Sequence, residues 1–416
     1  MTRRRQAAAC CLLIVLLSGV VGPSEATDLQ TTISNLYGPH GIFLQTNFRP
    51  FGDAPLQFQA TSLQGLDRLN SQLTSAIGVP SFSSSVTGFT FDIERGIPAR
   101  TTESLGPLLT ERATTLGARK LDLTLTYTRV DFTKLQGRPL DKLELVFQRN
   151  DANQPCDPSE PVVVCTARRD VIRTTLRVDL REDIVALIAT YGLTPHWDVG
   201  VVVPVIHIRL TATAHAAIFD QFGNPGGTRD GNLPIHFFGP NSTPPVASGG
   251  GDETGLGDIL LRTKYNFLRN YDDIIPDLAF LMEMKLPTGD EGQLLGTGGT
   301  TLTGLLVASR TYERWLTPHV NLGYEIDTGD TRQNAIRYAL GVDARLSSGL
   351  TVAAAVIGRL KPDGGETGDH ITDLSLGVKW NPAKSLILRA NVQIPLDKNS
   401  GLRADFIPTM GVEYLF

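Results

Sequence analysis

The sequence has few charged residues, little excess of either charge and only one long hydrophobic run. Charged residues make up 19% of the 416 residues, below the ~25% of soluble domains. The formal net charge of -5 leaves no basic field for nucleic acid. The one long apolar run lies at the N-terminus, and each membrane helix needs ~20 such residues. These absences exclude a nucleic-acid-binding protein and a bundle of membrane helices.

The first 26 residues have the three parts of a signal peptide. Three arginines at positions 3 to 5 are followed by an uncharged apolar run from Ala7 to Val21. Ser24-Glu25-Ala26 then fits a cleavage site between small residues. An uncleaved membrane anchor would need a longer run. We therefore expect a signal peptide over residues 1–26 and an exported mature chain.

Two of the four cysteines remain after the signal peptide is removed. Cys156 and Cys165 lie close together in a segment that contains proline. In an exported chain, two such residues predict a disulfide bond. A zinc site is the weaker alternative, because no Cys-x-x-Cys pair or adjacent histidine accompanies them.

From Lys120 onward, polar and apolar residues alternate with a period of two. In one segment Ile259 and Leu261 share one face, whereas Arg262 and Lys264 share the other. This alternation is typical of a strand with one face in an apolar medium and the other in water. A soluble β-sandwich gives the same local pattern, so alternation alone does not decide the fold.

Strand length favours a membrane barrel over a sandwich. About fourteen segments, including Gly88–Glu94 and Leu143–Arg149, are candidate strands, and many have ~10 residues or more. Soluble strands average ~5–6 residues, whereas a tilted strand that crosses a bilayer needs ~9–11. In hydrocarbon every backbone N–H and C=O needs an internal partner, so the sheet must close. The sequence predicts an all-β fold, a transmembrane antiparallel β-barrel of about 14 strands (roughly 12 to 16) over residues 88–416.

The connections between these strands alternate between short and long. We assign the short ones to the periplasmic side and the long ones, such as Arg95–Arg119 and Ala216–Thr254, to the outer side. Trp197, Trp315 and Trp380 then fall at the periplasmic boundary, where amphipathic rings gather in membrane proteins.

The polar face of the strands is expected to face the lumen. Both signs of charge occur on it, so the lumen either conducts small solutes or holds charges that only pair with one another. The sequence leaves both interpretations open, because barrel interiors are polar in either case. The predicted lumen-lining residues are Arg262, Lys264, Glu283, Lys285, Glu325, Arg337, Asp343, Arg345, Arg359, Asp373, Lys379 and Arg389.

Residues 27–87 alternate only weakly and form a separate segment before the barrel. Between Leu63 and Ile77 the apolar residues have helical spacing. We predict that this segment plugs the barrel or lies on its periplasmic side. A helix packed under the barrel and a periplasmic leader remain open alternatives.

Several segments resemble a known family. Gly255-Leu-Gly-Asp-Ile-Leu-Leu-Arg-Thr-Lys-Tyr265 and Lys285-Leu-Pro-Thr-Gly-Asp290 are similar to the outer-membrane transporters grouped under the meta-pathway of phenol degradation. The resemblance implies a β-barrel that takes up aromatic or other hydrophobic compounds through the outer membrane of a Gram-negative bacterium. The final alternating strand ends at Phe416 and resembles the signal recognised by the barrel assembly machinery. It implies that machinery and outer-membrane lipid as partners.

These observations predict an outer-membrane channel that passes small, hydrophobic or aromatic, molecules. The alternative is a structural or adhesive barrel that binds through its long outer loops. A lipid hydrolase is a third hypothesis, but the sequence has no Gly-x-Ser-x-Gly, no His-Glu-x-x-His and no phosphate-binding loop. We therefore predict no enzyme activity, no cofactor and no metal site.

Overall fold

The computed structural model describes most of the chain from residue 104 onward and only short pieces before it. The described residues are 28–37, 42, 44–46, 89–92, 97–100, 104–148, 152–153, 155, 158–159, 169, 171–219, 236–238, 246–269, 275–362, 370–383 and 386–414. Five features of the sequence lie outside them: the signal peptide, the helical spacing from Leu63 to Ile77, Cys156, Cys165 and Phe416. The predictions made for those features stay predictions.

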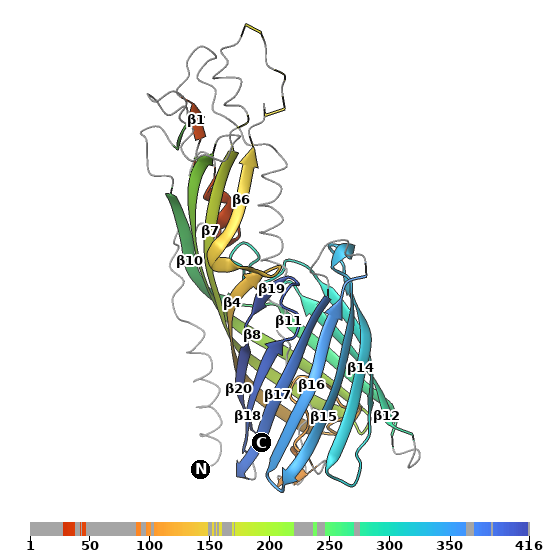
Figure 1. The fold of residues 1–416 in the computed structure, drawn as a ribbon. Helices are drawn as coiled ribbons and strands as arrows, with labels where there is room; N and C mark the ends of the chain where they lie inside the picture. The colour runs from red at the N-terminus through yellow and green to blue at the C-terminus, as the bar shows by residue number, and fades with distance from the viewer. Residues whose placement is uncertain are drawn as a thin grey trace.

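In the described part of the chain, twelve antiparallel strands close into a barrel (Figure 1). The last strand pairs with the first, so that Met410 lies opposite Tyr127. The wall strands are β4 (Lys120–Leu135), β7 (Val171–Thr194), β8 (Trp197–Phe219), β11 (Ile259–Leu268), β12 (Asp277–Leu286), β13 (Thr301–Ser309), β14 (Leu316–Asp327), β15 (Ala335–Ser347), β16 (Leu350–Leu360), β17 (His370–Ala383), β18 (Leu386–Pro395) and β20 (Ile407–Tyr414).

The predicted fold class is confirmed, with the strand count at the lower end of the expected range. Two of the fourteen candidates do not form wall strands. Around Gly88–Glu94, only the short β2 (Phe89–Asp92) forms, and it pairs with β3 (Ile97–Arg100) and with the first two residues of β4. The second candidate, β6 (Leu143–Gln148), pairs with the upper part of β7, beyond the barrel. Alternation cannot separate such strands from wall strands, because every strand has two faces.

The two faces of the wall explain why the barrel belongs in lipid. Leu340 and Leu322 point outward and are 62% and 56% exposed, whereas the charged Asp343 and Lys379 on the other face are fully buried. Soluble proteins show the reverse distribution. An exposed apolar belt around a closed sheet hides the backbone polar groups and places the apolar side chains against lipid tails. The barrel is therefore a transmembrane barrel.

The short connections lie at one end of the barrel, which we call the turn end. Trp197, Trp315 and Trp380 are all exposed near this end. Trp197 begins β8, Trp315 directly precedes β14, and Trp380 lies near the end of β17. Their shared position agrees with the interface that the sequence predicts for them. None of the helices among the described residues has the length and apolar character needed to cross a bilayer.

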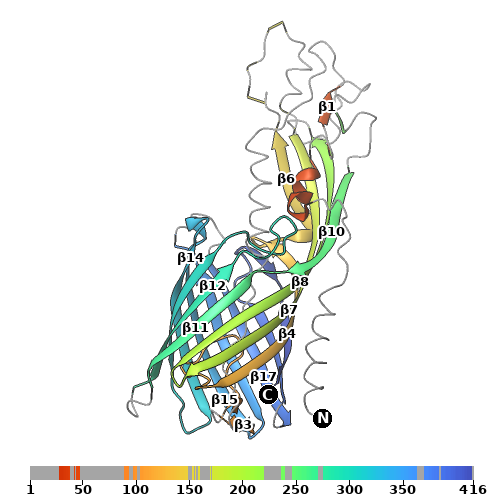
Figure 2. The same ribbon diagram turned by 180° about the vertical axis from the view of Figure 1, so that it is seen from behind.

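At the opposite end, β7 and β8 continue far beyond the barrel (Figures 1 and 2). They have 24 and 23 residues and pair along almost their full length. β6 flanks them on one side, and β10 (Val246–Leu256) flanks them on the other. We call these four strands above the barrel the extension. The outer loop expected over Ala216–Thr254 is shorter than predicted, because β8 runs on to Phe219 and β10 begins at Val246.

The N-terminal pieces pack on the extension. η1 (Leu29–Thr31) and α2 (Thr32–Asn35) lie beside β10 (red in Figure 2). A Cβ at Gly251 would meet Leu29 at 3.0 Å, so the glycines of β10 allow this close approach. We call the buried apolar residues gathered here the extension cluster, which includes Leu29, Ile33, Leu36, Leu176, Leu210, Leu294 and Leu295. The boundaries of the 27–87 segment stay a prediction.

Short elements complete the described chain. β1 (Leu44–Thr46) pairs with β9 (His236–Phe238). β19 (Leu402–Ala404) pairs with the far end of β4. The others are β5 (Arg138–Pro139), η3 (Leu140–Lys142) and η4 (Thr331–Gln333).

Candidate functional site

The most unusual part of the barrel is residues 104–119, which we call the strap. The sequence predicts an outer connection here, over Arg95–Arg119, but the strap lies against the inner wall near the turn end. The Leu105 N–H donates to Thr351 Oγ1 on β16, and the Thr115 hydroxyl donates to the Pro195 carbonyl in the turn before β8. Most strap side chains are buried. The strap therefore fills part of the lumen.

The strap sequence explains why it forms neither a helix nor a strand. Its apolar residues follow neither helical nor strand periodicity, and Gly106 and Gly117 have φ angles of +83° and +88°. Such angles suit glycine, because they place no Cβ against the backbone. The chain can therefore bend at both ends of the strap. Its backbone groups bond to side chains of the wall instead of to a neighbouring strand.

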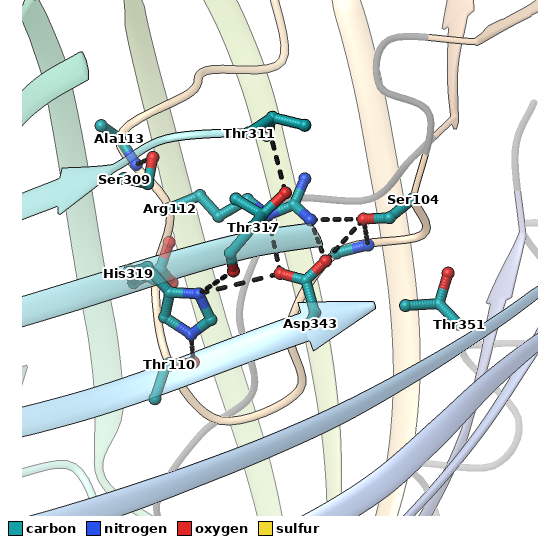
Figure 3. Close-up of polar contacts among 12 residues, drawn as sticks. Ser104, Thr110, Arg112, Ala113, Ser309, Thr311, Thr317, His319, Asp343 and Thr351 are labelled. Atoms are coloured by element: carbon teal, nitrogen blue, oxygen red, sulfur yellow. Dashed lines mark hydrogen bonds and ion pairs between the residues drawn. The ribbon is translucent and has the colours of Figure 1, made fainter. Parts of the chain in front are cut away.

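Arg112 ties the middle of the strap to β15 (Figure 3). Its Nε donates to Asp343 Oδ1 at 2.9 Å, and its Nη2 reaches both Asp343 Oδ2 and Ser104 Oγ. Ser104 also donates to Asp343 at 2.6 Å. Arg112 and Asp343 are almost completely buried. A buried charge needs a partner and hydrogen bonds, and this arrangement supplies both.

His319 on β14 holds the strap beside this ion pair. Its Nδ1 lies 3.1 Å from the Thr317 carbonyl, which only accepts, so we assign the ring proton to Nδ1. Nε2 then accepts from the Thr110 hydroxyl at 2.5 Å. Ser104 donates to Asp343 and not to His319, and the hydroxyl that reaches His319 belongs to Thr110. The lipid-hydrolase hypothesis needs a serine and a histidine together on the lipid-facing side, whereas this cluster is buried on the inner face.

Glu111 ties the strap to β11. Its carboxylate accepts from Arg262 Nη2 at 2.7 Å and from Lys264 Nζ at 3.0 Å. Arg262 also pairs with Glu283 on β12 at 2.8 Å. Burial raises the pKa of Glu111, but Lys264 and Arg262 outweigh that effect and lower it to about 2. Glu111 is therefore ionised at neutral pH.

This pKa predicts that the strap stays bound in mild acid. Because the folded-state pKa lies below the ordinary 4.5, the stabilisation from Glu111 is complete above that pH. It is lost only as the pH falls towards about 2. We expect the single-channel conductance in planar bilayers to remain constant between neutral pH and about pH 4.5. A stepwise increase within this range would show that Glu111 alone does not hold the strap in place, because Asp198 is a second carboxylate that accepts from the strap, at the Leu116 N–H.

A second buried ionic cluster lies where the barrel closes. Lys379 on β17 and Arg389 on β18 pair with Glu413 on β20 at 3.0 and 3.1 Å. Asp122 on β4 is buried in the same region. Arg389 also donates to the Leu108 carbonyl of the strap at 3.0 Å. We call Asp122, Lys379, Arg389 and Glu413 the seam cluster.

The other predicted lining residues lie mostly towards the extension end. Arg337 and Arg359 share Glu325, each at 2.6 Å. Lys285 lies 3.6 Å from Asp258. Asp373 pairs with Arg403. Arg345 lies near the turn end, where its Nε donates to the Ser347 carbonyl.

The structure thus places most of the predicted lining residues in three groups of paired charges. One group contacts the strap or its partners and consists of Arg262, Lys264, Glu283 and Asp343. The second group is the seam cluster, to which Lys379 and Arg389 belong. The remaining pairs lie nearer the extension end of the barrel. Their role in lining a solute path stays a prediction. Sequence reasoning missed the strap partners Glu111 and Arg112. They are adjacent charges in an otherwise uncharged stretch from residue 104 to residue 118. That pattern was the feature of the sequence that could have identified them as candidate site residues.

The end of the strap packs tightly against β7, which gives a stability prediction. A Cβ at Gly192 would lie 1.9 Å from the Gly117 carbonyl oxygen, and the Arg119 N–H donates to the Gly192 carbonyl. We expect Gly192→Ala to cost about 1–3 kcal/mol, because backbone atoms must move. The check is the temperature at which the folded band is lost in semi-native electrophoresis.

The control for Gly192→Ala is Gly299→Ala. A Cβ at Gly299 meets its nearest neighbour, the Asp327 side chain, at 3.4 Å. We expect this variant to behave like the unchanged protein. Equal transition temperatures for all three proteins would refute the tight contact.

Comparisons with known proteins show the family of the chain. The fold is similar to that of an outer-membrane channel from Pseudomonas putida F1, with 11% identity, a TM-score of 0.43, and coverage of 73% of this chain and 98% of that chain. It is also similar to the toluene transporter TbuX from Ralstonia pickettii, with 10% identity, a TM-score of 0.34, and coverage of 72% and 90%. No curated protein matches the sequence. The family model described as "Putative MetA-pathway of phenol degradation" matches residues 188–405, more than half of the chain, and the chain belongs to this family.

Proposed function

We propose that the protein is an outer-membrane channel for small, hydrophobic or aromatic, molecules. The observation that carries the proposal is the closed membrane barrel, whose interior is lined by polar and charged side chains and is partly filled by a strap that belongs to no strand. The family description, which refers to phenol degradation, supports an aromatic substrate.

The proposed route has two stages. An apolar solute first enters the barrel at the extension end. It next reaches the strap, which must shift to let it pass the turn end. The strap suits this role, because it is not part of a strand and its two glycines allow bending at its ends. The ion pairs of Arg112 and Glu111 hold it closed in the absence of solute.

A flux assay tests the proposal. The purified protein is placed in vesicles whose outer leaflet contains lipopolysaccharide, and entry of radiolabelled toluene and phenol is measured. We expect both to enter faster than into empty vesicles, with sucrose as the polar control. Heat-dependent migration in electrophoresis verifies that the barrel is folded. Folded protein without faster aromatic entry would refute the channel function.

The extension itself favours a second candidate, an adhesive barrel. β7 and β8 carry their paired strands well beyond the wall (Figure 1), where they present an exposed surface to the outside. Deleting residues 220–235, between β8 and β9, tests this alternative. Loss of cell attachment with unchanged aromatic flux would favour adhesion, and loss of flux alone would favour transport.

A further inference from the structure

Two cationic side chains of the wall converge on one carboxylate of the strap. Arg262 and Lys264 are two residues apart on β11 and therefore share its inner face. Each binds a different oxygen of Glu111, at 2.7 and 3.0 Å, and all three side chains are buried. Glu283 balances one of the two positive charges. Without Glu111 the two cations would lose the carboxylate that both of them contact.

Neutral donors and acceptors hold the strap backbone on either side of Glu111. Asn321 accepts from the Glu111 N–H and donates to its carbonyl, both at 2.9 Å. Asn266 donates to the Ala113 carbonyl at 2.7 Å. Near Glu111 the wall binds the strap backbone through amide side chains and the carboxylate through cations, and Lys264 also donates to the Arg112 carbonyl at 3.4 Å. The backbone of Glu111 is held by Asn321, independently of its carboxylate, so the carboxylate position is a site in its own right.

An apolar patch lies next to the cationic pair. Leu281 on β12 lies directly opposite Lys264, and Ala279 lies opposite Asn266. Val307 on β13 lies opposite Ala279, and all three pack with Ala113 of the strap. These three wall residues are almost fully buried beneath the strap. The wall under the strap thus combines a carboxylate-binding pair with an adjoining apolar surface.

We infer that Arg262 and Lys264, with the Leu281–Val307 patch beside them, form a binding site for small aromatic carboxylates, and that Glu111 occupies this site while the strap is closed. The inference rests on the proposed channel function and narrows its substrate class. A carboxylate of the solute replaces that of Glu111, and its ring replaces Ala113 on the patch. Charge is balanced in both states, because one carboxylate leaves the pair as another binds.

Glu111 is an internal competitor for this site. A group tethered by a short flexible segment has an effective concentration in the millimolar range. A free carboxylate must therefore reach comparable concentrations to displace it. Removing the charge of Glu111 removes the competitor and leaves the cationic pair in place. Binding of an external carboxylate should then become tighter.

Equilibrium dialysis of the full-length protein in detergent tests this inference, with radiolabelled benzoate as the probe. Benzyl alcohol is the neutral control, because it has a similar shape without the charge. We expect Glu111→Gln to tighten benzoate binding about tenfold or more and to leave benzyl alcohol binding unchanged. Adding Lys264→Met to Glu111→Gln should abolish the gain. Equal gains for benzoate and benzyl alcohol, or no gain for either in a folded barrel, would overturn the site.

A measurement on the unmodified protein covers the case in which Glu111→Gln does not fold. Single-channel conductance in planar bilayers reports when the strap leaves the wall. We expect benzoate at millimolar concentration to raise this conductance, whereas benzyl alcohol at the same concentration does not. Equal conductance with both compounds would refute the inference.

The two proposals fail differently. Toluene flux without charge-dependent benzoate binding keeps the channel and removes the site. Charge-dependent benzoate binding without aromatic flux keeps the site and removes the channel.

Discussion

Replacing Arg112 with alanine is expected to raise the single-channel conductance in planar bilayers several-fold. The change removes every side-chain contact between the strap and Asp343 except that of Ser104. It also leaves the buried Asp343 carboxylate without its guanidinium partner. Breaking a buried pair in this way costs about 3–5 kcal/mol, which is large for a segment of 16 residues. The strap should therefore leave the wall for much of the time.

The control for this prediction is Arg129→Ala. Arg129 lies on β4 and pairs with the exposed Asp131, so its loss removes an arginine without touching the strap contact. We expect it to leave conductance unchanged. Replacing Arg112 and Asp343 together, with methionine and leucine, should restore part of the closed state, because no buried charge is left alone. If Arg112→Ala alone leaves the conductance unchanged, the strap does not limit conduction through the lumen.

The second prediction concerns the contribution of the seam cluster to the stability of the barrel. Replacing Lys379 with methionine should destabilise the barrel by about 3–5 kcal/mol, because Lys379 and Glu413 are fully buried and lie 3.0 Å apart. The cluster then has two carboxylates and only Arg389 to balance them. The check is the temperature at which the folded band disappears in semi-native electrophoresis. We expect a clear decrease or a failure to assemble.

A charge-balanced variant distinguishes electrostatics from packing. Combining Lys379→Met with Glu413→Gln leaves Asp122 and Arg389 as one pair. We expect the double variant to be more stable than Lys379→Met alone, because the uncompensated charge is gone. Equal stabilities would mean that the lysine stem, and not its charge, supports the seam.

The alternation of polar and apolar residues was enough to predict the wall of the barrel. Arg262 and Lys264 fall on one face and Leu261 on the other because a strand repeats every two residues, and the structure keeps that division. The strand count was less certain. β6 alternates like a wall strand, but it pairs only with the part of β7 that rises above the barrel. The alternation within β6 does not indicate which half of the long strand β7 it will pair with.

The strap and the extension were not predicted, for different physical reasons. The strap has no periodicity, since its hydrogen bonds are made with side chains from seven wall strands that are distant in sequence. Three glycines in a row at residues 249–251 read as a loop, yet they form part of β10, where Leu29 and Thr32 pack against them. Glycine is unfavourable in a strand unless another segment approaches closely, and that segment lay far away in the sequence. Paired charges inside the barrel were one of two interpretations left open by the sequence, but the alternation could not say which residues pair.

The order of the chain adds a constraint on biogenesis. The strap leads directly into β4, and β4 is the strand on which β20 closes the ring. The groups that hold the sixteen-residue segment before β4 come from strands spread around the whole ring, including β8, β11, β15 and β18. Its complete docking surface therefore exists only after those strands have assembled, so docking of the strap reports that the ring is whole.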